Sequence, residues 1–136
     1  MFLKSFLLLC ILLHVSFAEG WRETKSVSLK KDFLERVLVK SDGSRRLLEF
    51  RWTLYANDNL VVLRNFDDIV HQHILKLNHK NQSFRIELLP HTAYKVKVPY
   101  ILVKFTEFDY KKNESKFDIF LQDDEEEIIL QYLKSE

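Results

Sequence analysis

Glycine and cysteine are scarce in this chain of 136 residues, which has two glycines and one cysteine. Glycine normally makes up about 7% of a soluble protein. Loops that cradle phosphate groups need two or three glycines within a short run, and Gly20 and Gly43 stand far apart. The sequence therefore excludes such a loop. One cysteine also excludes an internal disulfide framework and a CxxC redox motif.

The chain also lacks an excess of charge of either sign. It has 21 basic and 20 acidic residues, for a net charge of +1. Proteins that bind nucleic acid usually carry a basic face, so we expect no nucleic-acid partner. Hydrophobic residues make up 46% of the chain and aromatic residues 13%, which is typical of a folded globular protein. The length predicts a single domain.

Residues 1–18 have the organisation of a secretory signal peptide. Lys4 supplies the positive charge, an apolar run follows, and Ser16 and Ala18 place small residues before a cleavage point. The apolar run is shorter than the roughly 20 residues that cross a membrane. We expect cleavage after Ala18, leaving 19–136 as one β domain with no stable membrane span. An uncleaved anchor and a lipid attached to Cys10 are lesser alternatives.

The compartment follows from the same segment. After cleavage the domain contains no cysteine, whereas small extracellular domains of eukaryotes commonly depend on disulfides. This favours a bacterial periplasmic protein that crosses the inner membrane. Two glycosylation sequons, at 81–83 and 113–115, are then chance occurrences.

Apolar and polar residues alternate with a period of two along much of the mature chain. The even positions of 46–56 include Leu48, Phe50, Trp52 and Leu54, whereas the odd positions are mostly polar. Such alternation predicts a strand with one buried face. Asp42-Gly43 lies between this run and the preceding apolar run, and this dipeptide predicts a tight hairpin.

Further runs of this kind predict an all-β fold of about eight antiparallel strands joined as a meander, either a small barrel or a two-sheet sandwich. The run 26–40 predicts one strand interrupted by a bend or bulge. Residues 60–63 are continuously apolar, which predicts a strand covered on both faces. Pro99 predicts an edge or a bend, because proline cannot donate to a ladder.

His71 and His73 are weak candidates for a metal site. Residues two apart on a strand point to the same face, so both imidazoles could reach one ion. Zinc or copper would need one or two further ligands, and nothing in the sequence brings a third donor near. We therefore expect no metal and no cofactor, with the two histidines on a half-exposed strand face.

Five consecutive acids occupy 123–127. Calcium loops alternate carboxylates and need a glycine at a sharp turn, which this run lacks. A solvated loop is the simpler interpretation. A docking patch for a basic partner is the functional one, with Asp123, Asp124 and Glu125 as its residues.

The chain offers no motif for catalysis. It has no GxSxG sequence, and the mature part has no cysteine that could act as a nucleophile. Carboxylates are numerous, but their number alone carries no information about a paired-carboxylate site. We expect that the protein is not an enzyme.

Aromatic residues in polar surroundings indicate an interface instead. Trp21 directly follows the cleavage region, Tyr55 falls on the polar positions of its strand, and Tyr110 stands in a polar loop. Aromatic side chains often anchor protein interfaces. We therefore expect Trp21, Tyr55 and Tyr110 to contact a partner.

Two functions remain open. The first is a non-enzymatic interaction or scaffold subunit of a bacterial cell-envelope assembly, such as a secretion, pilus or flagellar-motor accessory structure, which binds an envelope protein or itself. The alternative is a lipocalin-like barrel that carries a small apolar ligand. Its cavity would be lined by Phe50, Trp52, Leu54, Phe84, Ile86 and Tyr100.

Overall fold

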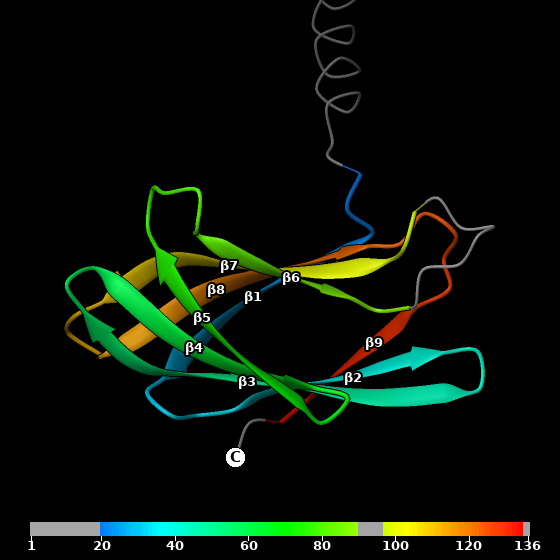
Figure 1. Ribbon diagram of the computed structural model, residues 1–136, viewed down its shortest axis with the longest axis horizontal. Coiled ribbons are helices and arrows are strands. Elements are labelled where there is room, and N and C mark those ends of the chain that lie inside the picture. The colour runs from blue at the N-terminus through cyan, green and yellow to red at the C-terminus, as the bar shows by residue number, and fades with distance from the viewer. Residues whose placement is uncertain (1–19, 90–96, 135–136) are drawn as a thin grey trace, which may run out of the picture.

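The computed structural model describes residues 20–89 and 97–134, so the predicted signal peptide lies outside the described residues. Nine strands form two antiparallel sheets that face one another (Figure 1). One sheet has the order β1-β8-β7-β6 and the other the order β5-β4-β3-β2-β9. The strands are β1 (Glu23–Lys30), β2 (Glu35–Ser41), β3 (Ser44–Ala56), β4 (Asn59–Phe66), β5 (Ile69–Lys76), β6 (Ser83–Glu87), β7 (Tyr100–Asp109), β8 (Glu114–Gln122) and β9 (Ile129–Leu133).

The prediction of an all-β, antiparallel fold is confirmed. The sheets form a sandwich and do not close into a barrel, which decides between the two predicted architectures. The meander holds within β2–β5 and within β6–β8, but β1 and β9 each pair with a strand distant in sequence. In the part of the chain that is described, no helix is long and apolar enough to cross a membrane.

Short turns join the meander strands. The predicted hairpin at Asp42-Gly43 is confirmed: Ser41 pairs with Ser44, and Gly43 has a φ of 67°. The two-residue turns 57–58 and 67–68 have positive φ at both positions. Turns of that kind match the twist of a hairpin, and Asn and Asp tolerate the left-handed region better than most residues.

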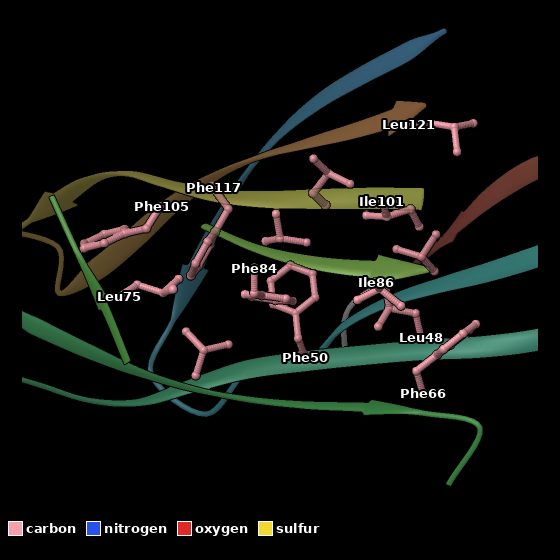
Figure 2. Packing of buried hydrophobic residues seen from close by; sticks show 14 of the residues in the cluster. Leu48, Phe50, Phe66, Leu75, Phe84, Ile86, Ile101, Phe105, Phe117 and Leu121 are labelled. Carbon is pink, nitrogen blue, oxygen red and sulfur yellow. The ribbon is translucent and has the colours of Figure 1, made fainter. Parts of the chain in front are cut away.

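The core fills the space between the sheets (Figure 2). Phe50 of β3 meets Phe117 of β8 and Phe84 of β6, with ring centroids 5.4 and 6.1 Å apart and the rings nearly perpendicular. Edge-to-face pairs of this kind contribute beyond the area they bury. Trp52 is also buried, and its indole Nε1 donates to the carbonyl of Leu29 at 2.7 Å. That bond joins β3 to β1 across the sandwich.

A β-bulge in β3 makes the residues after Trp52 face the opposite way from the prediction. The pairing of β3 with β4 shifts register between Trp52 and Leu54. Since an extra residue reverses the alternation that follows it, Leu54 turns outward and Tyr55 turns toward the core. Tyr55 accordingly packs against the core cluster, whereas Leu54 is exposed.

Three other local expectations were also wrong in part. The bend predicted within 26–40 is a crossing between sheets, because β1 belongs to the four-stranded sheet and β2 to the five-stranded sheet. Residues 60–63 are covered on one face only: Leu60 and Val62 are buried, but Val61 and Leu63 are partly exposed. Pro99 precedes β7, which is a central strand.

Asp123 organises the loop between β8 and β9. Its carboxylate accepts hydrogen bonds from the backbone amides of Ile128, at 2.7 Å, and Glu127, at 3.2 Å, and forms an ion pair with Arg22. The residue is 4% exposed. A buried carboxylate needs partners of this kind, so Asp123 has a structural role and is not presented to solvent.

We predict that Asp123→Ala lowers the free energy of unfolding by about 2–4 kcal/mol, because it leaves the Arg22 charge and two amides without their acceptor. Asp124→Ala is the matched control. Asp124 is exposed; among the described residues it accepts a hydrogen bond from the Gln122 side chain at 2.7 Å and lies 3.6 Å from the Lys97 ammonium. Its loss should change stability by less than about 1 kcal/mol. Equal losses in urea unfolding would contradict this role for Asp123.

Candidate functional site

A groove of about 610 Å³ opens along the side of the sandwich where β5 and β6 form the sheet edges. Its wall combines arginines and a histidine with apolar side chains and two acids. The lining residues are Arg46, Arg64, Phe66, Asp67, Ile69, His71, Arg85, Ile86, Glu87 and Leu89.

Arg64 occupies an inward-facing position of β4. The alternation of this strand buries Leu60, Val62 and Phe66, and Arg64 shares their face. Arg64 lies just beyond the apolar run 60–63, so a strand predicted from that run alone does not include it. The signal was present: extending the period of two by one step places a cation on an apolar face.

His73 of β5 accepts a hydrogen bond from Arg64. The guanidinium Nε donates to His73 Nε2 at 2.9 Å. The imidazole also stacks on Phe84, with centroids 4.4 Å apart and an interplanar angle of 5°. Burial, followed by the charge of Arg64 and by His71, lowers the pKa of His73 to about 4. His73 is therefore neutral near pH 7.

The other two arginines already have partners. Arg46 pairs with Asp67 at 2.8 Å and lies over the ring of Phe66. Arg85 lies 3.6 Å from the ring centroid of Tyr100 and 3.9 Å from a Glu87 oxygen.

Arg64 differs from them, because no described carboxylate forms an ion pair with it. Burial lowers its pKa from the ordinary value, but a guanidinium stays charged at neutral pH. Its remaining N–H groups can bind a carboxylate or phosphate.

The two predicted histidines lie side by side, with ring centroids 6.4 Å apart. His73 Nε2 is already engaged with Arg64. Over 20–89 and 97–134, no group of three or more His, Cys, Asp and Glu residues is placed to hold a metal ion.

The three aromatic residues predicted to form an interface lie in two separate clusters: Trp21 in one, and Tyr55 with Tyr110 in the other. Trp21 packs against Phe120 and Tyr100, with centroids 5.0 and 6.0 Å away. Tyr55 stacks on Phe108 at 4.0 Å, and its hydroxyl lies 3.4 Å from that of Tyr110. This contact with Tyr110, with burial as a smaller cause, raises the pKa of Tyr55 to about 12. Only Tyr110 is strongly exposed, at 72%.

Only part of the predicted acidic patch is exposed to solvent. Asp124 and Glu125 are exposed beside the buried Asp123. The lining proposed for a barrel is divided too: Phe50, Trp52, Phe84 and Ile86 belong to the packed core, Tyr100 is half-buried and Leu54 faces solvent.

A second groove, of about 370 Å³, lies beside β1 and β9. It contains the buried Glu35, whose pKa is raised by burial and lowered to a smaller extent by Lys25. Lys25 also lies 3.9 Å from the ring centroid of Tyr132, whose buried hydroxyl finds no hydrogen-bond partner among the described residues.

Exposed apolar side chains lie on β5 and on β3 of the same sheet. Val70 and Ile74 of β5 are 63% and 53% exposed, and Leu54 of β3 is 51% exposed. The register places Ile74 beside Val61 and Val61 beside Leu54, all on the outer face of the five-stranded sheet. We call Leu54, Val61, Val70, Gln72 and Ile74 the β5 surface.

Known protein families give no match to this chain, and no curated protein or solved structure matches it significantly.

The pKa of His73 predicts a loss of stability in acid. An unfolded histidine titrates near 6.5, whereas folded His73 titrates near 4. Between these values the unfolded state binds a proton that the folded state does not, so stability falls as the pH drops from about 6.5 to about 4. With allowance for partial exposure, this contribution is about 1–2 kcal/mol.

His73→Gln is the control, because glutamine does not titrate and its carbonyl can still accept from Arg64 Nε. Denaturant unfolding at several pH values should give a shallower decline for this variant than for the unmodified chain. Identical slopes between pH 6.5 and 4 would show that His73 is not the group responsible.

Proposed function

We propose that this protein is a non-enzymatic interaction subunit that binds a protein partner through the β5 surface. The observation that carries this proposal is the position of β5: it ends the order of its sheet and pairs only with β4 among the described strands. Its outward residues Val70 and Ile74 are exposed. An edge with these properties is a ready template for another strand.

Two of the other three sheet edges, β6 and β1, support this choice by contrast. The remaining edge, β9, also has no acid, lysine, arginine or proline, and its Ile129 is 62% exposed. Natural edge strands are normally protected by charged side chains, proline or bulges. β6 carries Arg85 and Glu87 at its exposed positions, and β1 carries charged or polar side chains at most of its own. Residues 70–74 of β5 read Val-His-Gln-His-Ile, and they include no acid, lysine, arginine or proline. The charged side chains that protect β6 and β1 are therefore absent from residues 70–74 of β5.

We place this subunit in the bacterial periplasm, as part of an envelope assembly such as a secretion, pilus or flagellar-motor accessory structure. The support is the signal-peptide pattern of residues 1–18 and the lack of cysteine in 19–136. The geometry favours this function over a carrier of apolar ligands, because Phe50, Phe84 and Phe117 fill the space between the sheets.

Photocrosslinking in the cells that produce the protein tests the proposal. A photoreactive amino acid in place of Val70 should give a discrete crosslinked protein band. The same amino acid in place of Lys104, which is exposed on the outer face of the other sheet, should give none. No discrete product from position 70, or equal products from both positions, would contradict the proposal.

A further inference from the structure

We propose that the partner of the β5 surface is a second copy of this chain, joined by antiparallel pairing of β5 with β5 about a two-fold axis at Gln72. This inference rests on the proposed function and names its partner. It follows from three features of β5: the direction of its free backbone groups, the register that its sequence allows and the charges at its ends.

The backbone groups of the even-numbered residues point away from β4. The amide of Lys76 donates to the carbonyl of Asn81, at 3.1 Å, and not to β4. Since the direction of backbone groups alternates along an antiparallel strand, the amides and carbonyls of Val70, Gln72 and Ile74 also point to the open edge. In the described part of the chain, no bond from these three residues to another strand is found on that side.

The sequence of β5 is complementary to itself in one register. Paired residues of an antiparallel ladder lie on the same face, so β5 can pair with itself only when both residue numbers are odd or both are even. With Gln72 opposite Gln72, Val70 lies opposite Ile74 of the second copy and Ile69 lies opposite Leu75. Apolar side chains therefore meet apolar side chains on both faces.

The charges favour this register over the two registers next to it. Asp68, in the turn just before β5, comes beside Lys76 of the second copy, and the symmetry makes this contact twice. In the next allowed register on one side, Val70 lies opposite Lys76 of the second copy. In the next allowed register on the other side, Asp68 lies opposite Ile74. Both put a charge against an apolar side chain. Of these three registers, only the one centred on Gln72 avoids this.

The resulting dimer would provide hydrogen-bond partners for the backbone groups at the open edge of β5. The pairs 70–74, 72–72 and 74–70 would exchange about six backbone hydrogen bonds, and the five-stranded sheets of the two copies would become one continuous sheet. The outer apolar row of Leu54, Val61 and Ile74 would continue into Val70 of the second copy. An isologous contact of this kind closes on itself and does not propagate into a fibre.

Gln72→Pro tests the pairing directly. Proline removes an amide that bonds to none of the described strands, so the pairing of β4 with β5 can persist while the open edge loses its central donor. Sedimentation velocity of the protein purified from cells expressing the full-length chain should show a concentration-dependent dimer, and this variant should weaken it by about 100-fold or more. Unchanged far-ultraviolet circular dichroism confirms that the variant is folded.

Charge reversal tests the register. Asp68→Lys and Lys76→Asp should each weaken the dimer by about ten-fold at low salt, because each creates two like-charge contacts. A mixture of the two variants should regain the dimer, since both contacts between unlike variants are then attractive. This rescue should disappear at high salt.

Three results would overturn the inference: a monomer at every concentration, a dimer unaffected by Gln72→Pro, or no recovery when the reversed variants are mixed. A monomer that still crosslinks to a different protein from position 70 would overturn the second copy as partner and leave the proposed function standing. The absence of both a dimer and a crosslink would remove both proposals.

Discussion

The structure depends on the contact between two aromatic inner faces. Phe50, Phe84 and Phe117 come from three strands of two different sheets, and their edge-to-face packing holds the sheets together (Figure 2). No disulfide is available to the domain, so this core supplies the main stabilisation. Every strand must therefore present one face to the core, and the period of two in the sequence is the result.

The same constraint explains the candidate site. His73 lies on an inward position of β5, where Phe84 covers its ring and Arg64 donates to it. Polar groups can face inward here because they sit at the open side of the sandwich, next to a groove. The half-burial lowers the pKa of His73 and keeps the imidazole neutral, so that it can accept the bond from Arg64.

The sequence predicts the strands well and their arrangement less well. Alternation identifies β3 and β6, and Asp42-Gly43 identifies a hairpin, because these signals are local. The crossing from β1 to β2 and the pairing of β9 with β2 depend on long-range contacts that no local pattern encodes. The bulge after Trp52 is one added residue, yet it moves Leu54 out of the predicted interior and Tyr55 into contact with the core.

The site was predictable only in fragments. The sequence indicated that His71 and His73 share a face, but not that Arg64 lies beside them. It indicated Asp123 as a surface acid, although the fold uses that carboxylate to close a loop. The open edge could not be recognised, because whether the backbone groups of Val70 and Ile74 lack a partner strand depends on β5 being last in its sheet. That position follows from the order of all the strands.

The central claim is that the open edge of β5 is paired in the working protein. Hydrogen exchange of the backbone amides of Val70, Gln72 and Ile74, measured by nuclear magnetic resonance over a range of protein concentrations, tests it most directly. The account predicts that these amides exchange slowly and that their protection grows with concentration. Rapid exchange of all three at every concentration, with His71 and His73 protected by β4, would contradict it.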